Sequence, residues 1–406
     1  MKKFDLIIIG AGPAGLMSAI AASEVGAVVA VLEKNALAGR KLLLAGNGKC
    51  NITHGGEVKD LLNHYADKAG FVKPALYNFC NQDLIDFFEN RGLKMTTMED
   101  GKVFPETLNG QDVLKVLIDN CRKNKVSLNF SEPVKSAVKK AGDFETLTNK
   151  EKYSSKSLIV TTGGQSYPST GSTGDGYFFA KKFGHHISEL KPALTSIEIK
   201  DFKFGGCAGI SMKNVNLNFY RDNRKFHQAD GDILFTHGGL SGPAILDGSR
   251  YLEAEDAIKI NCLPDFDLEE ALIKESQAFG KKFLKTVLVR FKLPERLILK
   301  ILESNKIPSS LKMADLNKPL RKKIVDSLTE LTFTVKQVGD FNSAMVTRGG
   351  VLTNEINPRT MESKSVKGLY FAGEVVDVDA DTGGYNLQWA FSSGFLAGKN
   401  AVARSL

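Results

Sequence analysis

A glycine-rich hexapeptide near the N-terminus carries the clearest chemical signal in the sequence. Gly10, Gly12 and Gly15 form a GxGxxG motif between an apolar run at residues 4–9 and a stretch of helix formers at residues 14–24. In that context the first glycine permits a tight turn, the second lets the backbone approach a pyrophosphate, and the third permits close helix–strand packing. The free amides at the helix start then hold the phosphates. The motif therefore predicts a site for an adenine dinucleotide.

An acidic residue follows the second predicted strand, where such a site would hold a ribose. Glu33 comes directly after residues 28–32 and stands 18 residues beyond Gly15. Its carboxylate can accept hydrogen bonds from both hydroxyl groups of an adenosine ribose, whereas it would repel a 2′-phosphate. Strand, glycine turn, helix and acid together predict that the chain binds FAD or NAD, but they do not distinguish between these two cofactors.

Three later segments favour FAD. Arg40 and Lys41, followed by the glycine-rich residues 45–51, offer cations and backbone amides to a diphosphate and a ribityl chain. Residues 161–164 end a predicted strand at the sheet edge where ligands bind. Residues 383–387 open a second helix, whose positive end suits the charge that develops at the N1–C2 carbonyl edge of a reduced flavin. No second GxGxxG follows a strand, so we expect no separate nicotinamide-binding domain.

Few side chains qualify as proton donors, and few are needed because a flavin carries the redox step itself. Cys50, Tyr385 and His237 are our candidates, with Tyr167 as a fourth. A small thiol between glycine loops is more often a packing residue, and a tyrosine after two glycines is as often an ordinary packed aromatic. A histidine between Thr and Gly residues is more often structural. The catalytic and the structural interpretation therefore both stay open for each candidate.

Several aspartates lie near these glycine segments. Asp377, Asp379 and Asp381 alternate along the chain, but they lack a complete EF-hand pattern, so we predict no metal site. Asp175 precedes the apolar residues 177–183, and we predict it as the N-cap of a helix rather than as a catalytic acid.

The elements that must position these residues change in character along the chain. Alternating strand and helix patterns in the first part give way to strand-like alternation with glycines at 193–262, then to helical spacing at 268–331, and the first strand pattern returns at 368–372. The predicted domains are an FAD-binding domain (1–192 and 345–406), a β-rich substrate domain (193–267 and 331–344) and a helical insert (268–330).

Length and composition bound the class of protein. A chain of 406 residues exceeds what one hydrophobic core usually supports, and 42% hydrophobic with 25% charged residues is typical of a soluble globular protein. Five scattered cysteines without a CxxC pair fit a reducing cytoplasm. No apolar run is long enough for a transmembrane helix. We therefore expect a cytoplasmic, multidomain protein without a membrane partner.

The formal net charge of +8 is distributed unevenly. Residues 268–330 hold 14 lysines and arginines against 8 acids, or +6, whereas residues 229–267 hold 2 against 8, or −6. A local basic excess is what a polyanion-binding face shows, although lysine-rich helices are often simply solvated. Few aromatic residues stand among these lysines, so the sequence gives base stacking little support.

Four segments resemble a known FAD-dependent flavoprotein family, and the resemblance spans nearly the whole chain. The segments are GRKLLLAGNGKCNIT, TTGGQSYPSTGSTGDGY, FTHGGLSGPAIL and GLYFAGEVVDVDADTGGYNLQWAFSSG. The family includes aminoacetone-oxidase-like, bile-acid-reductase-like and ribosomal-RNA dihydrouridine-synthase-like NAD(P)/FAD-dependent oxidoreductases. The resemblance implies an α/β fold, in which a discontinuous glutathione-reductase-like FAD-binding Rossmann domain is interrupted by a β-barrel-like domain with a small helical subdomain.

The resemblance also implies individual contacts with FAD. Val134 would reach the adenine through its backbone, and Glu374 would hold the ribityl chain. Family members often have GGGRCN where this chain has GNGKCN, and Lys49 in place of arginine weakens the case for bidentate phosphate binding there. Together with the motif residues, the expected cofactor contacts are Gly10, Gly12, Ala14, Gly15, Glu33, Lys34, Arg40, Lys41, Gly48, Asn51, Val134, Thr162, Gly163, Gly164, Gly373, Glu374, Gly384, Asn386 and Leu387.

These observations predict an FAD-dependent oxidoreductase, with NAD(P)H as a transient reductant and a conjugated C=C bond as the reduced group. A uridine of ribosomal RNA, bound through the basic helical insert, is the specific expectation. One alternative is an oxidase or reductase of a small amine or enone. Another is a flavin-loaded redox sensor without turnover. The sequence leaves the choice among NADH, NADPH and oxygen open, and likewise the oligomeric state.

Overall fold

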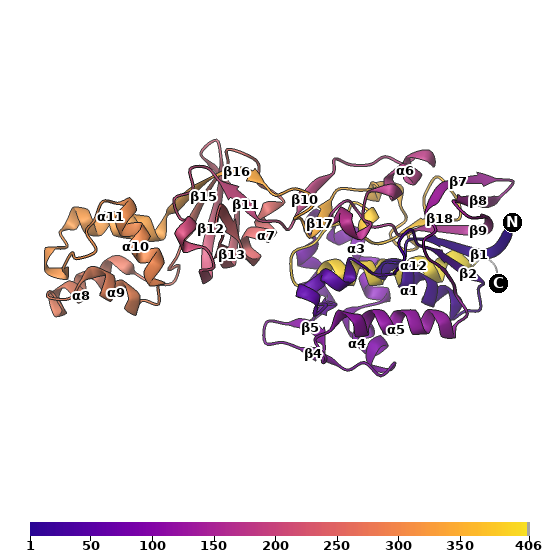
Figure 1. The fold of residues 1–406 in the computed structure, drawn as a ribbon, viewed down its shortest axis with the longest axis horizontal. Helices are drawn as coiled ribbons and strands as arrows, with labels where there is room; N and C mark the ends of the chain where they lie inside the picture. Colours follow the sequence, from indigo (N-terminus) through magenta and orange to yellow (C-terminus); the bar gives the residue numbers. More distant parts are fainter. Residues whose placement is uncertain (404–406) are drawn as a thin grey trace. The chain divides into compact units, whose positions relative to one another are not determined.

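The computed structural model describes residues 1–403, and the chain divides into two units, each with its own hydrophobic core (Figure 1). Unit 1 comprises Met1–Pro192 and Ala344–Leu406, and unit 2 comprises Ala193–Ser343. Unit 1 is therefore assembled from both ends of the chain. No helix among the described residues is both long and apolar enough to span a bilayer.

A mixed seven-stranded sheet forms the centre of unit 1, in the order β6-β2-β1-β9-β8-β7, with β18 also paired to β9. Neighbours among β6, β2, β1, β9 and β18 are parallel, whereas β7, β8 and β9 pair antiparallel. In the register of β1, Ile7 lies between Ala30 and Leu158. The strands are β1 Lys2–Ile9, β2 Val29–Leu32, β6 Ser127–Asn129, β7 Val134–Lys140, β8 Asp143–Thr148, β9 Lys152–Val160 and β18 Leu369–Phe371.

Two helices from opposite ends of the chain cross at close range beside this sheet. The Ser18 hydroxyl of α1 donates to the Gly394 carbonyl of α12 at 2.8 Å, and a Cβ added at Gly394 would lie 2.4 Å from the Ala14 carbonyl oxygen. The crossing therefore requires a residue without a side chain. The helices of unit 1 are α1 Pro13–Ser23, α2 Val58–Leu62, α3 Ala69–Asn78, α4 Asn81–Glu89, α5 Gly110–Lys123, α6 Asp175–Lys182 and α12 Tyr385–Val402.

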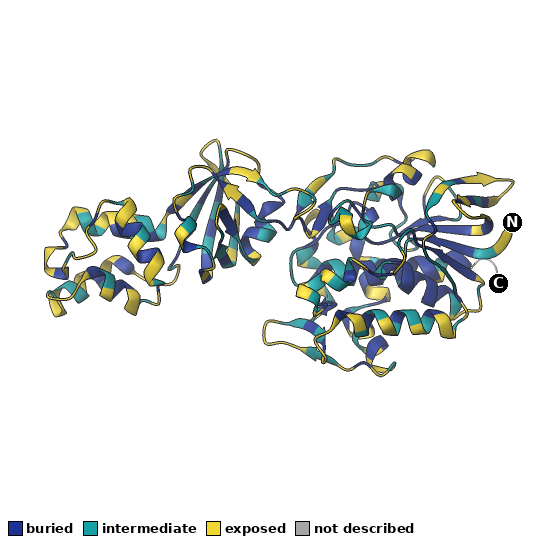
Figure 2. Cartoon of the chain, in the orientation of Figure 1, coloured by how far each residue is buried: buried dark blue, intermediate teal, exposed yellow. Residues whose placement is uncertain are grey.

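Smaller elements complete unit 1. A three-stranded sheet has the order β3-β5-β4, and a two-stranded sheet pairs β10 with β17. Short 3-10 turns carry several of the glycine segments, and Figure 2 shows the burial of each element. These elements are β3 Thr53–His54, β4 Met95–Thr97, β5 Lys102–Pro105, β10 Lys191–Ala193, β17 Val346–Arg348, η1 Leu42–Gly48, η2 Asn63–Lys68, η3 Pro168–Thr170, η6 Thr353–Glu355 and η7 Gly373–Val375.

Unit 2 is a closed barrel with the strand order β11-β14-β13-β12-β15-β16. Helices α8 to α11 are inserted between β15 and β16, and their buried residues belong to the same hydrophobic cluster as those of the barrel. The insert therefore extends the core of the barrel. The elements are β11 Ile197–Ile199, η4 Gly205–Cys207, β12 Ser211–Arg221, β13 Arg224–Phe235, β14 Gly239–Ser241, α7 Pro243–Ser249, β15 Ala257–Asn261, α8 Leu268–Ala278, α9 Leu284–Arg290, α10 Glu295–Ser304, η5 Met313–Asp315, α11 Lys318–Thr329 and β16 Leu331–Val338.

The start of α6 differs from the sequence prediction. The N-cap is Gly174, at φ +81°, and no side chain caps the helix. Asp175 is the first helical residue, and its carboxylate accepts hydrogen bonds from the Thr173 hydroxyl at 2.8 Å and the Lys34 ammonium at 2.6 Å. The predicted N-cap role of Asp175 was wrong, because the glycine adopts the left-handed conformation at the cap and leaves the aspartate to pair with Lys34.

Candidate functional site

The glycine turn after β1 is closed toward the sheet and open at its middle glycine. A Cβ added at Gly10, whose φ is +104°, would lie 2.7 Å from the Thr161 carbonyl oxygen, and one added at Gly15 would lie 2.0 Å from the Gly10 carbonyl oxygen. At Gly12 no atom lies within 4 Å of such a Cβ. Helix α1 begins there without a side-chain cap and without an acid in its first turn. The turn is therefore a cradle for an anion.

Glu33 is held rigidly at the end of β2. One carboxylate oxygen accepts from the Ala11 amide at 2.8 Å, and the other accepts from the Asn35 amide and the Asn35 side chain, both at 2.8 Å. A carboxylate offers about four acceptor sites, so binding both hydroxyls of a ribose would release the Asn35 side chain. The Glu132 amide donates to the Glu33 carbonyl at 2.9 Å, and Val134 begins β7 two residues further along the chain.

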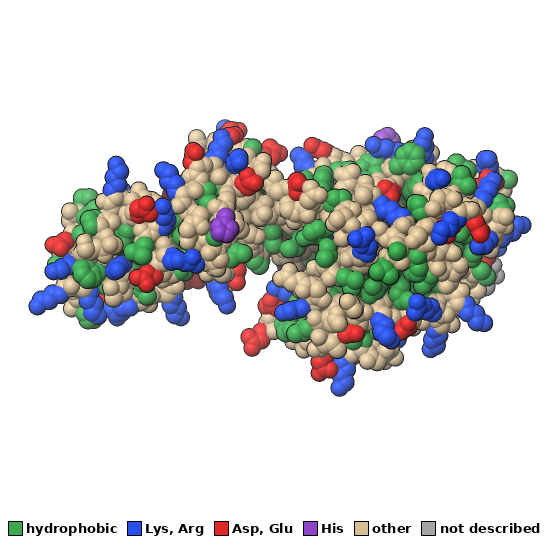
Figure 3. Space-filling view, in the orientation of Figure 1, with side chains coloured by type: hydrophobic (Ala, Val, Ile, Leu, Met, Phe, Trp, Pro, Cys, Tyr) green, Lys and Arg blue, Asp and Glu red, His purple; other side chains and the backbone are tan. Residues whose placement is uncertain are grey.

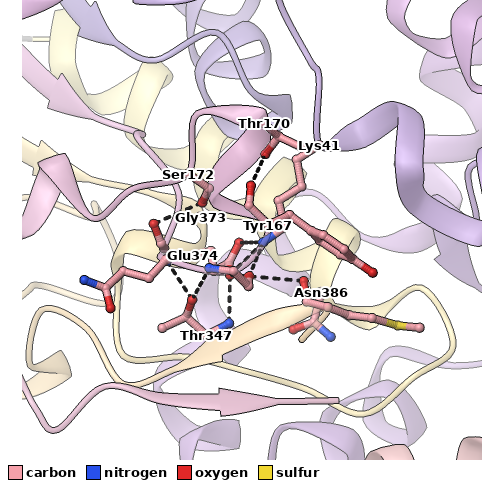
Figure 4. Close-up of polar contacts among 12 residues, drawn as sticks. Lys41, Tyr167, Thr170, Ser172, Thr347, Gly373, Glu374 and Asn386 are labelled. Carbon is pink, nitrogen blue, oxygen red and sulfur yellow. Dashed lines mark hydrogen bonds and ion pairs between the residues drawn. The ribbon is translucent and has the colours of Figure 1, made fainter. Parts of the chain in front are cut away.

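Four chain segments meet at Glu374 of η7 (Figure 4). Its carboxylate accepts hydrogen bonds from the Lys41 ammonium at 2.7 Å, the Ser166 hydroxyl at 2.9 Å and the Thr347 amide at 2.8 Å. A Cβ added at Gly164 would lie 2.9 Å from the same carboxylate. The structure therefore brings the segments around Lys41, residues 161–164 and Glu374 together.

Gly373 links this cluster to the glycine turn. A Cβ added there would lie 2.9 Å from the Cβ of Ala14, and the residue has a φ of +74°. Its amide donates to the Ser393 hydroxyl at 2.9 Å, and the Trp389 indole donates to its carbonyl at 3.2 Å. The C-terminal segment is thus fixed against the start of α1.

The start of α12 lies in a second tight turn. Gly384 has a φ of +101°, and a Cβ there would lie 2.5 Å from the Thr53 carbonyl oxygen. The Asn386 side chain accepts from the Ala380 amide at 2.9 Å and donates to the Ala380 carbonyl at 2.8 Å. Leu387 is partly buried beside it. These contacts fix the preceding loop at a helix N-terminus, whose first turn contains no acid.

The segment around Cys50 is tightly packed. Gly48 has a φ of +87°, and the Asn51 side chain accepts from the Val103 amide at 3.2 Å. The Cys50 thiol is fully buried, and burial raises its pKa to about 12. A neutral thiol without solvent access is typical of a packing residue.

Tyr385, the first residue of α12, lies in a stack of three aromatic rings that the sequence did not indicate. Its ring centroid is 3.9 Å from that of His64, with an interplanar angle of 12°, and 5.2 Å from that of His54. His64 Nδ1 lies 3.0 Å from a carboxylate oxygen of Asp381. His64 is partly exposed, so the stack joins a buried tyrosine to an imidazole in contact with solvent. Neither histidine belongs to a motif, which is why sequence reasoning missed both.

Residues 161–167 follow β9 and form a loop, in which Gly163 and Tyr167 have a positive φ. The Thr162 hydroxyl is buried without a hydrogen-bond partner among the described residues, and it lies 2.1 Å from where a Cβ of Gly176 would be. Its side chain thus packs against α6. Gly163 has a φ of +74°, and Tyr167, at φ +52°, is half-buried.

The other predicted residues lie at the edges of this site or outside it. Arg40 is exposed and donates to the Asn35 side chain at 3.3 Å. Asp377 ion-pairs with Lys68 at 3.1 Å. His237 is exposed in unit 2 and is not among the residues that unit 1 brings together. Within residues 1–403 no group of three or more His, Cys, Asp or Glu side chains is placed to hold a metal ion.

Residues 4–400 match the family described as the HI0933-like protein Rossmann domain. The chain belongs to this family. It is 32% identical over 417 residues to the ribosomal RNA dihydrouridine synthase of Escherichia coli (strain K12), with 99% of both chains covered. It is 34% identical to the protein of the same name from Haemophilus influenzae, with 96% of both covered. It is 29% identical to the 3-dehydro-bile acid delta(4,6)-reductase of Clostridium scindens, with 98% of both covered.

A solved structure of 3-ketosteroid delta1-dehydrogenase from Sterolibacterium denitrificans matches with a TM-score of 0.53 at 12% identity, covering all of both chains. At that identity the likeness concerns the fold alone. It supports the predicted glutathione-reductase-like fold of the FAD-binding domain.

The site of this HI0933-like protein fits FAD. The open space at Gly12 suits a pyrophosphate, Glu33 lies at the end of β2 where dinucleotide-binding folds place a ribose-binding acid, and Glu374 is anchored close to the same turn. The start of α12 at Gly384 supplies further amides for negative charge. FAD is the cofactor, and the protein is an FAD-dependent oxidoreductase.

Proposed function

We propose that this protein reduces a uridine of ribosomal RNA to dihydrouridine, in the cytoplasm, with NAD(P)H as the transient reductant. The observation that carries the proposal is similarity over 96–99% of the chain to two proteins named ribosomal RNA dihydrouridine synthase. That span includes the basic insert as well as the cofactor site. When bound, FAD supplies the two-electron chemistry that reduces the C=C bond of the uracil ring.

The residues of unit 1 would bind and orient the cofactor. The amides at the start of α1 hold the diphosphate, Glu33 accepts from the adenosine ribose, and Glu374, neutralised by Lys41, orients the ribityl chain. The amides that open α12 at Gly384 stabilise negative charge at the N1 edge.

Reduction of a C=C bond also needs a proton, and we place its source at the ring stack of Tyr385. Nδ1 of His64 lies 3.0 Å from a carboxylate oxygen of Asp381, and the His64 side chain is partly exposed. The ring of Tyr385 stacks with the imidazoles of His54 and His64. Cys50 and His237 stay alternative donors, although burial of the thiol leaves Cys50 without access to water.

A second candidate function is reduction of an enone in a small molecule. Its support is the similarity to the protein named 3-dehydro-bile acid delta(4,6)-reductase, at 29% identity over 98% of the chain. The excess of basic residues in the insert favours RNA, because a small enone offers no array of charges to neutralise.

Mass spectrometry of ribosomal RNA tests the proposal. We expect ribosomal RNA from a strain lacking this gene to lose the mass of two hydrogens at one or more uridines. The wild-type gene should restore that mass, and a Glu33→Ala gene should not. Unchanged ribosomal RNA in the deletion strain would refute the proposal, and consumption of enones by the purified protein would then favour the second function.

A further inference from the structure

The turn between α8 and α9 presents two exposed aromatic rings with lysines between them. Phe279 is 36% exposed and Phe283 is 41% exposed, and Lys281 and Lys282 between them are exposed as well. From the sequence we expected little base stacking in the insert, because few aromatic residues stand among its lysines. The structure corrects that expectation at these two positions.

The turn has a fixed backbone. The amides of residues 313–314 donate to the carbonyls of Lys282 and Gly280, each at 2.9 Å, and Phe283 forms an isolated antiparallel bridge with Lys312. This bridge places Lys312, which is also exposed, beside the turn. A surface ordered in advance loses less conformational entropy when it binds a ligand.

The positive charge of this surface is not neutralised by the protein. The surface carries four lysines, Lys281, Lys282, Lys285 and Lys312, which we call the turn lysines. None of them has an ion-pair partner among residues 1–403, whereas other cations of the insert do, such as Lys274 with Glu270 and Arg290 with Glu275. Figure 3 shows Lys and Arg side chains distributed over the helical insert. Uncompensated charge thus accompanies the two exposed rings.

The rings and the cations also contact one another. The Lys282 ammonium lies 4.1 Å from the ring centroid of Phe279, and the Arg290 guanidinium lies 5.1 Å from it. Aromatic faces interleaved with cations are what single-stranded nucleic acids require, since bases stack on the rings while the cations follow the phosphates.

We propose that the α8–α9 turn binds unpaired nucleotides of RNA through Phe279, Phe283 and the turn lysines. The inference rests on the proposed function, since it assigns that substrate a docking surface. An anionic membrane offers the same charge, but insertion needs a continuous apolar face, and here Lys281 and Lys282 separate the two rings.

The test measures binding of a short fluorescein-labelled oligouridine to the full-length holoprotein by anisotropy. Lys281→Gln/Lys282→Gln should weaken binding and make the slope of log K against log salt shallower by about 1.4, because two phosphate contacts are lost. Phe279→Leu/Phe283→Leu should weaken binding roughly tenfold and leave that slope unchanged, because leucine keeps the apolar contact but not the stacking face. Unchanged flavin absorbance and Tm confirm that the variants are folded.

Helix α6 offers a matched control in unit 1. Phe178 is 51% exposed, and the Lys182 ammonium lies 5.5 Å from its ring centroid, next to the exposed Lys181. The variants Lys181→Gln/Lys182→Gln and Phe178→Leu should bind the oligonucleotide as the wild type does.

The inference would be overturned if the turn variants bound the oligonucleotide as the wild type does. It would also be overturned if the control variants weakened binding equally. Turn variants that lose binding to phosphatidylglycerol vesicles but keep binding to RNA would show that the surface binds membranes instead. The ribosomal RNA assay separates this inference from the proposed function. If the turn variants lose oligonucleotide binding while ribosomal RNA contains no uridine reduced by this protein, the surface stands and the proposed function falls.

Discussion

Glu33 carries much of the cofactor site in one side chain, because it joins the end of β2 to the glycine turn through the Ala11 amide. We predict that Glu33→Ala weakens FAD binding by at least about tenfold, since hydrogen bonds to a charged group each contribute about 1.5–3 kcal/mol. The dissociation constant is measured from the fluorescence of released flavin. Glu57→Ala, at an exposed acid that pairs with Lys59, is the control. Equal affinities of the Glu33 variant and the wild type would contradict this role.

Tyr385 provides a second test at the residue scale. Tyr385→Phe keeps the ring that stacks on His64 and removes only the hydroxyl. We expect flavin reduction by NAD(P)H to proceed at the wild-type rate, while product formation falls about 100-fold, the usual contribution of general acid catalysis. Stopped-flow absorbance separates the two half-reactions.

Cys50→Ala is the matched comparison for Tyr385→Phe, because Cys50 is also buried in unit 1. It should keep product formation within a few-fold of the wild type. The reverse order, with the cysteine variant inactive and the phenylalanine variant active, would place the proton donor at Cys50.

Motif residues could be identified from the sequence, and their neighbours could not. Glu33 and Gly12 stand out because the dinucleotide fold fixes their spacing. His64 contacts Asp381 across 317 residues of sequence, and neither position lies in a pattern that indicates the other. Such contacts depend on how η2 folds against the start of α12, which local propensity does not encode.

The crossing of α1 and α12 is the critical contact at the scale of elements. In Gly394→Ala the added Cβ would meet backbone at 2.4 Å, so α12 must shift. We predict destabilisation by about 1–3 kcal/mol, as overpacking generally causes, together with weaker FAD binding, because α12 also positions Asn386. Thermal unfolding and flavin retention measure the two effects.

Gly70→Ala in α3 is the control for that prediction, because no atom lies within 4 Å of its added Cβ. Alanine should leave stability unchanged or raise it by up to about 1 kcal/mol, since it is the better helix former. Similar destabilisation by both substitutions would show that the crossing has no special role.

A buried histidine links the end of α6 to the segment before β18. The Nδ1 atom of His185 lies 3.0 Å from Glu355, and Nε2 lies 2.9 Å from the Ser363 hydroxyl. Burial lowers the pKa of His185, although Glu355 acts in the opposite direction. In the unfolded chain the imidazole of His185 therefore binds a proton below about pH 6.5, whereas in the folded protein it stays neutral to a lower pH. The free energy of unfolding consequently falls as the pH falls below about 6.5.

We accordingly predict a lower Tm at about pH 5.5 than at about pH 7.5, and a smaller difference between the two in His185→Gln. Differential scanning calorimetry at both pH values measures this. A variant whose Tm falls as much as that of the wild type would show that another group causes the dependence.

Long elements with a clear period were predictable, and short ones were not. The apolar run of β1 and the helical pattern of α5 are plain in the sequence. Strand β3 has two residues, too few for any alternation to be recognised. The start of α6 was misjudged by one residue, because an aspartate and a glycine are both good N-caps and only the backbone conformation at Gly174 decides between them.

At the scale of the whole molecule, the chain leaves unit 1 after Pro192, builds unit 2 and returns at Ala344. The change of pattern near residue 193 indicates this interruption in the sequence. The closure of the barrel was implied only by the family resemblance, since the partners β11 and β16 lie far apart in sequence. The basic helical insert belongs to unit 2, whereas the cofactor site belongs to unit 1, so the proposed binding of RNA and the binding of the cofactor are assigned to different units.

Uridine reduction by the purified protein tests the central claim most directly. The holoprotein is incubated without oxygen with NADPH or NADH and with ribosomal RNA from the deletion strain, and the RNA nucleosides are analysed by mass spectrometry. We predict that uridine gains the mass of two hydrogens at the positions lost in the deletion strain, with one reduced nicotinamide consumed per uridine. Oxidation of the nicotinamide by an added enone, with the RNA unchanged under every condition, would contradict the account.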